Sequence, residues 1–187
     1  WVDANHFYMS FTGQVAIPGI GNVQDEDVVY YNTGVWSLFF DGSVNGVGGT
    51  DLDAIHIVGS ALYFSTDNTL VPPGAGGVGD NADIYRWNGG NSYTRMIDAS
   101  AVGWSTANVD GLVWIDANHV YLSYSTDTAV SGLGAVQDED VIYYSVGSWS
   151  VYFDGTAHGL TSGNLDIDAF DIPQTGAAPQ KGTNSRR

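Results

Sequence analysis

A threefold internal repeat constrains this chain more than any single motif. The sequence matches itself at a period of about 57 residues, over residues 1–55, 56–113 and 114–172. The first and third repeats are near copies, because QDEDVVYY in the first returns as QDEDVIYY in the third. The second repeat is the divergent one. We therefore expect one domain, residues 1–172, built from three copies of a single supersecondary unit.

Each repeat contains four short segments that favour β-strands, rich in β-branched and aromatic residues and separated by Gly, Asn, Asp and Pro. Asn-Gly-type turns at residues 32–34 and 88–91 predict tight hairpins between the second and third strands. Residues 12–24 contain Pro18 and several glycines, so they predict a long connection. No window has a helical period, and the fold class is all-β. In the first repeat the strands are expected at residues 7–11, 28–31, 35–40 and 54–58.

The third strands carry large apolar side chains in alternation. Trp36, Leu38 and Phe40 are expected on one face, packed into the core. In the second repeat, Arg86 and Arg95 stand on paired strands where the first repeat is apolar. These arginines mark either a partner contact or an exposed outer edge.

The two ends of the repeat region are complementary. Residues 110–126 predict two strands around a tight turn, and residues 53–66 repeat that unit. Residues 1–10 hold only the turn and the second strand, whereas residues 168–172 hold only the first strand. We therefore expect residues 168–172 to pair with residues 6–11 by strand exchange, either in a homo-oligomer or within a longer parent chain.

Repeats of this form, with an Asp-Ala-apolar strand, a tight turn and a Leu-Tyr-Phe-Ser strand, resemble the blades of bacterial secreted β-propellers of the NHL or YVTN type. The resemblance implies three four-stranded antiparallel blades whose first strands line a central channel. Propeller rings have about four to eight blades, so it also implies a ring of two chains, a filament, or a fragment of a longer chain. A β-trefoil is the alternative, because it also has three four-stranded repeats and closes within one chain.

Charge narrows the choice of partners. The chain has 21 acidic and five basic residues, for a net charge of -16, and three of the basic residues lie in the Gly-, Pro- and Ser-containing segment 173–187, which predicts a flexible tail. Such a surface repels a phosphate backbone, so we expect no nucleic-acid partner. No apolar run is long enough for a membrane span. Acidity and the absence of cysteine resemble secreted bacterial surface proteins, which implies an extracellular or cell-surface location.

Aspartates gather just before the predicted strands, in Asp-Glu-Asp and Asp-x-Asp groups. Several short carboxylates and backbone carbonyls together suit Ca²⁺, which takes six to eight oxygen ligands. The hypothesis is that at least one Ca²⁺ ion stabilises the domain; alternatively, the aspartates serve turns and keep β edges apart. The candidate metal ligands are Asp25, Asp27, Asp51, Asp53, Asp80, Asp83, Asp138, Asp140, Asp166 and Asp168.

Asp53, Asp110 and Asp168 occupy the same place in successive repeats, at the start of each first strand. In a propeller these carboxylates would stand at the channel mouth, where they predict a cation or substrate site. Alternatively, each one caps the strand of its own repeat. His6 and His119 lie in equivalent turns and are expected to have a turn role.

Aromatic residues offer a second kind of binding site. Tyr30, Tyr143 and Trp104 are candidates for exposed rings that stack on sugars. The sequence contains no nucleophile elbow, P-loop or dinucleotide-binding motif. The leading interpretation is therefore a non-catalytic, calcium-stabilised binding or assembly module. The alternatives are a calcium-dependent propeller hydrolase and a glycan-binding lectin.

Overall fold

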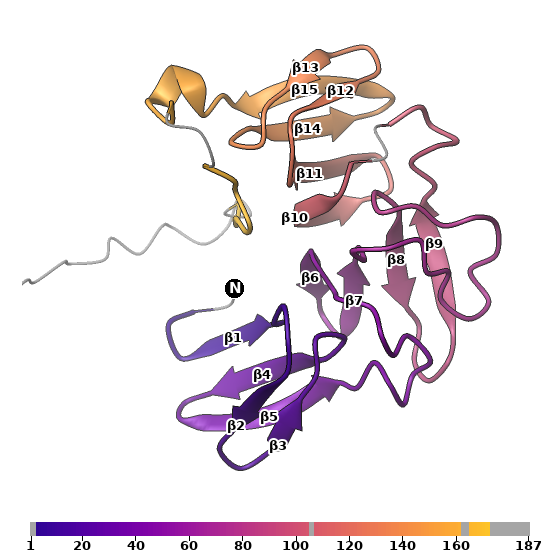
Figure 1. Ribbon diagram of the computed structural model, residues 1–187, viewed down its shortest axis with the longest axis vertical. Coiled ribbons are helices and arrows are strands. Elements are labelled where there is room, and N and C mark those ends of the chain that lie inside the picture. Colours follow the sequence, from indigo (N-terminus) through magenta and orange to yellow (C-terminus); the bar gives the residue numbers. More distant parts are fainter. Residues whose placement is uncertain (1–2, 105–106, 162–164, 173–187) are drawn as a thin grey trace, which may run out of the picture.

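The computed structural model describes residues 3–104, 107–161 and 165–172 and shows an all-β chain of antiparallel sheets (Figure 1). The predicted tail, residues 173–187, lies outside the described residues. Sheet 1 consists of β1 (His6–Met9), β4 (Val28–Asn32) and β5 (Val35–Phe40). Sheet 2 consists of β6 (Ile55–Val58), β7 (Ala61–Phe64), β8 (Ile84–Trp87) and β9 (Tyr93–Ile97). Sheet 3 consists of β10 (Val109–Asp116), β11 (His119–Tyr124), β14 (Val141–Ser145) and β15 (Ser148–Phe153).

Local sequence explains the meander within each sheet. Along β7 the burial alternates, with Leu62 and Phe64 fully buried, as expected for a strand with two different faces. The β4–β5 turn has positive φ at Thr33 and Gly34, and the β14–β15 turn has it at Val146 and Gly147. Two consecutive residues with positive φ match the right-handed twist of the strands they join, which favours a tight hairpin.

The three sheets follow one another in an arc (Figure 1), with β6 and β10 toward its inner side and the outer strands at its rim. The apolar core lies between successive sheets. Phe40 of sheet 1 packs with Leu62 and Phe64 of sheet 2, while Trp104, which follows β9, packs with Leu122 and Ile142 of sheet 3. Burial between successive sheets therefore holds the arc together.

The connection at residues 12–24 is not the plain loop that its glycines and proline predict. It forms a second hairpin, β2 (Val15–Ile17) with β3 (Gly21–Val23), and the third repeat forms the equivalent β12 (Thr128–Val130) with β13 (Gly134–Val136). Gly19 and Gly21 have positive φ in its turn. These short strands escaped prediction because each contains only three residues.

The third strands do not present one continuous apolar face. In sheet 1 the pairing register shifts between Val28 and Val29, so that Leu38 and Phe40 flank a β-bulge. Phe40 is buried against sheet 2, whereas Leu38 is 39% exposed and Trp36 packs on the opposite side with Phe7. The expected core role of Leu38 is therefore wrong, because the extra residue reverses the alternation.

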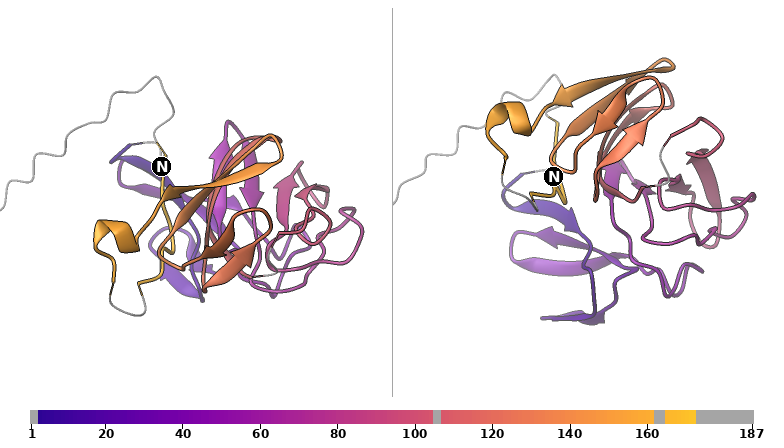
Figure 2. Two further views of the ribbon diagram at one scale, coloured as in Figure 1. Left: turned by 90° about the horizontal axis from the view of Figure 1, so that it is seen from above. Right: turned by 45° about the horizontal axis from the view of Figure 1, so that its top comes forward.

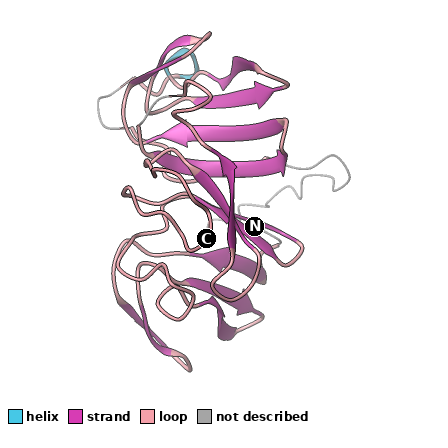
Figure 3. Ribbon diagram, turned by 90° about the vertical axis from the view of Figure 1, so that its right-hand side faces the viewer, coloured by secondary structure: helices cyan, strands magenta, loops and turns pink. Residues whose placement is uncertain are grey.

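Strands account for nearly all the regular structure (Figure 3), together with one turn of 3₁₀ helix, η1 (Thr156–His158). No described sheet closes on itself, as the barrel of a β-trefoil would. Among the described residues, no helix is long and apolar enough to cross a membrane.

Candidate functional site

Three buried aspartates act as backbone clamps. Both oxygens of Asp27 accept backbone hydrogen bonds, from the N–H groups of Gln24 and Gly42 at 2.9 Å each. Asp140 binds two N–H groups in the same way, from Gln137 and Gly155. The Asp27 clamp joins the turn before β4 to the loop after β5, and the Asp140 clamp joins the turn before β14 to the loop after β15. Asp27 and Asp140 were expected as metal ligands, but the structure gives their oxygens this backbone role.

Asp83 is the third clamp and carries an additional ion pair. It accepts the backbone N–H groups of Asp80 at 3.3 Å and of Ala99 at 3.0 Å. It also accepts the Tyr85 hydroxyl at 2.9 Å, and Arg95 Nη1 lies 3.3 Å from its carboxylate. The pKa of Asp83 is raised by burial, an effect opposed by the hydrogen bonds and by Arg95. Arg95 also donates to the backbone carbonyls of Gly76 and Val78, so its side chain is 7% exposed. This burial contradicts the predicted exposed or partner-facing position for Arg95.

Two first-strand aspartates are linked on the inner side of the arc. Asn108 donates to Asp53 and to Asp110, in the latter case at 3.4 Å. Burial raises the pKa of Asp53, an effect opposed by the hydrogen bond from Asn108. Asp53 and Asp110, predicted to share one end of neighbouring first strands, are thus bridged by an amide that sequence reasoning overlooked. Its position, equivalent to Asp51 and Asp166 in the other repeats, was the available signal.

The third predicted channel-mouth residue joins the same group. Carboxylate oxygens of Asp110, Asp166 and Asp168 lie within 4.8 Å of one another. Burial, with the charge of Asp166 and a hydrogen bond shared with it, raises the pKa of Asp110 to about 7. Burial also raises the pKa of Asp166, opposed by that hydrogen bond. Below about pH 7 a proton on Asp110, hydrogen-bonded to Asp166, therefore relieves part of the repulsion in this group, and a bound cation is the alternative way to neutralise it.

A second acidic group lies at the junction of sheets 1 and 2. Burial raises the pKa of Asp51 to about 7, with further contributions from the charges of Asp53, Asp67 and Asp25. Asp67 accepts hydrogen bonds from Thr50 and from the backbone N–H of Asp51, both at 3.0 Å. Three of the candidate metal ligands therefore lie near one another here, since the charges of Asp25 and Asp53 both act on Asp51.

The remaining candidate ligands fall into two further groups. Asp80, Asp83 and Asp98 have carboxylates close together, but Arg95 already pairs with two of them. The other group combines Asp138 with residues that were not predicted as ligands, Asp127 and Glu139. In the described chain, three groups therefore bring three carboxylates within 4.8 Å of one another: these two and the group of Asp110, Asp166 and Asp168. The Asp110 group lies on the inner side of the arc.

These raised pKa values predict how stability depends on pH. Because the folded forms of Asp51 and Asp110 bind a proton more tightly than the unfolded chain, stability should fall as pH rises from about 4 to about 7. Asp110→Asn should flatten this dependence, measured as the melting temperature between pH 5 and 8 in EDTA. Asp116→Asn is the control, since hydrogen bonds lower the pKa of Asp116. If the melting temperature of Asp110→Asn falls with pH as steeply as that of the wild type, the raised pKa assigned to Asp110 is wrong.

The aromatic candidates lie in different environments. Tyr30 stacks on Tyr8 with the ring centroids 4.6 Å apart, and Tyr143 stacks on Tyr121 with the ring centroids 4.4 Å apart. The side chains of Tyr30 and Tyr143 are both half-buried. Trp104 is only 6% exposed, which contradicts its expected role as an exposed stacking ring. It is buried because it fills the gap between sheets 2 and 3.

The turn histidines lie as expected from their equivalent positions. His6 Nδ1 contacts Asp3 at 2.8 Å, and His119 Nδ1 contacts Asp116 at 2.8 Å. The Asp3 carboxylate also accepts the Asn5 N–H, and the Asp116 carboxylate accepts the Asn118 N–H. Both histidines therefore belong to a local turn motif.

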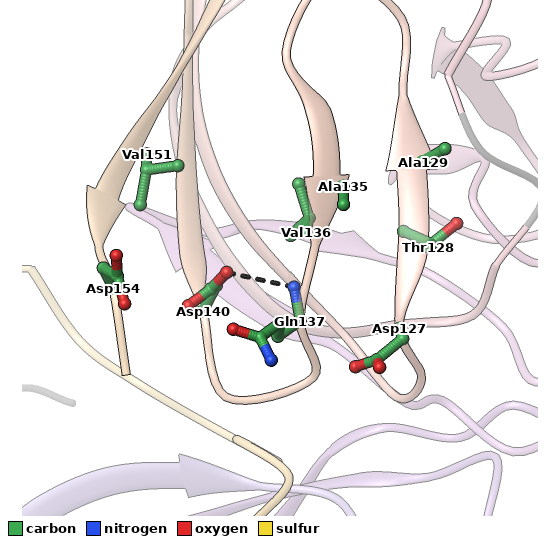
Figure 4. A pocket seen from close by; sticks show the side chains of 9 residues that line it. All are labelled: Asp127, Thr128, Ala129, Ala135, Val136, Gln137, Asp140, Val151 and Asp154. Atoms are coloured by element: carbon green, nitrogen blue, oxygen red, sulfur yellow. Dashed lines mark hydrogen bonds between the residues drawn. The ribbon is translucent and has the colours of Figure 1, made fainter. Parts of the chain in front are cut away.

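A shallow hollow of about 570 Å³ lies between the β12–β13 hairpin and β15 (Figure 4). Its carboxylates are Asp127, Asp140 and Asp154. Asp140 points toward the backbone N–H of Gln137 and is held by it, while Asp154 accepts the Ala157 N–H at 2.7 Å. Asp127 accepts the Asp138 N–H at 3.2 Å. All three carboxylates are thus engaged with the backbone, which favours a structural role for this hollow.

Residues 165–172 lie on the inner side of the arc, beyond sheet 3 (Figure 1). The buried Ser123 hydroxyl donates to the Ile167 carbonyl at 2.9 Å, and the Ile167 N–H donates to the Asp138 carbonyl at 3.2 Å. Sheet 2 holds the start of β10 with the same two bonds, from Ser65 to Val109 and from Val109 to Asn81. Residues around Ile167 are therefore held as β10 is held, in the position from which a first strand begins.

No protein-family model matches this sequence, and a search of curated proteins finds none with significant similarity.

Proposed function

We propose that the chain is a non-catalytic binding and assembly module of propeller type that works outside the cell by strand addition. The observation that carries this proposal is a difference in the number of strands between the sheets. Sheets 2 and 3 have four strands, whereas the described part of sheet 1 has three, with β1 at its inner edge. A β edge of this kind is a template for a further strand.

The added strand is residues 168–171, supplied by another copy or by a longer parent chain. The same two bonds that position β10 also position the start of this segment. In sheet 2, β6 pairs with β7 so that His56 faces Tyr63, and in sheet 3 Val113 faces Tyr121. The equivalent pair in the completed sheet 1 is Asp171 with Tyr8.

A disulfide tests this register, because the natural chain contains no cysteine. In the double variant Tyr8→Cys/Asp171→Cys the two Cα atoms should lie about 4.5–5.5 Å apart, within reach of a disulfide. We expect covalent dimers under mild oxidation, detected by non-reducing electrophoresis. Tyr30→Cys/Asp171→Cys is the control, since Tyr30 lies one strand further away.

The outcomes separate the alternatives. A disulfide within one chain would show that the added strand comes from the same molecule and would contradict exchange between copies. Failure of the double variant to form any disulfide beyond the control level would contradict strand addition itself.

We also propose that Ca²⁺ stabilises this module at the Asp110, Asp166 and Asp168 group. The support is the close approach of three carboxylates, whose mutual repulsion a divalent cation would relieve. Free Ca²⁺ at 100 times its dissociation constant should stabilise the fold by about 2.7 kcal/mol, which raises the melting temperature by several degrees. Melts in Ca²⁺ and in EDTA at constant ionic strength measure the effect. The absence of a shift, or an equal shift in Asp110→Asn, would contradict this site.

A further inference from the structure

The two ends of the arc expose surfaces that are equivalent to those buried inside it. We call the face of each sheet that points toward the next sheet along the chain its front, and the opposite face its back. By equivalence with the residues packed at the internal junctions, the front of sheet 3 carries Tyr121, Tyr152, Phe153 and, in the loop after β15, Leu160. The back of sheet 1 carries Tyr31, Trp36 and, in the β2–β3 turn, Ile20. At the two junctions within the chain, the front of one sheet packs against the back of the next. The ends of the arc therefore carry the same two kinds of surface that meet at a junction.

One side chain after each last strand projects across a junction. Val47, Trp104 and Leu160 occupy the same place in the three repeats. Their loops share a conformation, because the N–H of each donates to the carbonyl five residues earlier, at 2.9, 2.8 and 2.9 Å respectively. Val47 is 0% exposed and Trp104 is 6% exposed, whereas Leu160 remains partly exposed. Leu160 is thus held in the position of a junction residue, but none of the described sheets packs in front of it.

The receiving surface is also present in this chain. Trp104 packs on sheet 3 with its ring centroid 4.5 Å from that of Trp149 and 5.6 Å from that of Tyr144. The equivalent pair in sheet 1 is Trp36 and Tyr31, whose rings lie 4.8 Å apart, the same arrangement as the 5.0 Å pair in sheet 3. The back surface of sheet 1 therefore has an aromatic pair equivalent to the one that contacts Trp104 at the second junction.

The last strand of sheet 3 is also less covered than the last strands of sheets 1 and 2. Phe40 at the end of β5 is 1% exposed and Ile97 at the end of β9 is 8% exposed, both covered by the next sheet. Their counterpart Phe153 is only half-buried, and the neighbouring Tyr152 is 53% exposed. Tyr63 of sheet 2 stacks on Trp114 of sheet 3 at 4.8 Å, whereas its counterpart Tyr121 stacks on Tyr143 of its own sheet.

From these equivalences we propose that a second copy of this chain docks its sheet 1 onto the front surface of sheet 3, with Leu160 between Tyr31 and Trp36 of that copy. This inference rests on the proposed assembly function and identifies the partner and the contact. One chain carries both complementary surfaces, because sheet 1 and sheet 3 lie at opposite ends of the arc (Figure 2, right). The contact continues a packing pattern that the chain already uses twice.

Two variants, each altering one surface, test the contact. Leu160→Asp places a charge in the junction, and Trp36→Ser removes the receiving ring. Both residues are partly exposed in the single chain, so each variant should remain folded by circular dichroism. Val78→Asp is the control, because Val78 is 85% exposed and lies in the loop between β7 and β8 of the middle sheet. Sedimentation velocity in 0.15 M salt, a concentration that screens repulsion between these acidic copies over about 8 Å, measures self-association.

We expect Leu160→Asp and Trp36→Ser each to weaken self-association about tenfold or more, as the loss of a buried apolar contact requires, and Val78→Asp to leave it unchanged. Mixing the two variants should restore heterodimers, since one junction in the mixture keeps both native surfaces. Unchanged association in both variants, or a mixture that stays monomeric, would overturn the contact. If the Tyr8–Asp171 disulfide still forms between chains in that case, strand addition stands and only this contact is wrong.

Discussion

Replacing Gly155 by alanine should destabilise the protein by about 1–3 kcal/mol, the usual cost of overpacking, although its backbone conformation suits any residue. Gly155 has φ -61° and ψ -44°, so the reason is steric. A Cβ atom there would lie closer than 3.0 Å to Glu139, both to its side chain and to its carbonyl oxygen. Gly42 faces Glu26 in the same way in sheet 1.

The second repeat contains the internal control for this prediction. There the equivalent pair is Ala82 with Ala99, both fully buried, so a small partner accommodates the extra methyl group. Glu139→Ala should accordingly restore part of the stability that Gly155→Ala removes, as measured by urea denaturation of the single and double variants. Additive losses in the double variant, or a Gly155→Ala protein as stable as the wild type, would contradict the steric explanation.

Replacing Asp83 by asparagine should destabilise the protein by about 3–5 kcal/mol, the cost typical of leaving one buried charge without its partner. Asp83 is fully buried, and it faces Arg95, whose Nε has no hydrogen-bond partner within the described structure. The remaining acidic partner of Arg95 would be Asp98, whose side chain is 40% exposed and compensates the charge less well.

A double-variant cycle isolates the charge effect. Arg95→Met removes the guanidinium while keeping a long apolar side chain, so Asp83→Asn/Arg95→Met should recover much of the loss. Asp98→Asn is the matched control, since exposed ion pairs contribute only about 0–1 kcal/mol. Denaturation in guanidinium chloride measures the free energy of unfolding of the wild type and of these four variants. A cost for Asp83→Asn no larger than that of Asp98→Asn would show that the buried pair does not stabilise this sheet.

The repeat pattern was sufficient to predict the all-β fold and much of the strand content. The third strand of the first repeat, β5, was predicted at its observed bounds, and β4 and β6 differ from prediction by one residue. The alternation of apolar and polar residues predicts these strands correctly, because successive side chains of a strand point to its buried and its exposed face. The closeness of Asp53 to Asp110 also followed from their equivalent positions in neighbouring first strands.

Other features depend on contacts that a linear pattern does not encode. The β-bulge beside Leu38 arises from register between two strands, and it reverses which side chains face the core. Trp104 lies in a loop segment, where an aromatic ring predicts exposure, yet the neighbouring sheet buries it. The clamp role of Asp27 and Asp140 needs backbone N–H groups from 15 residues away, at Gly42 and Gly155.

The mass of the unmodified chain in solution tests the central claim most directly. Light scattering coupled to size-exclusion chromatography should be run over a range of protein concentrations in Ca²⁺ and 0.15 M salt. If the ends of the arc complete one another between copies, the mass should approach a multiple of 19.9 kDa, and twice that value if two copies close a ring. A mass of 19.9 kDa at every concentration would contradict assembly between copies of this chain.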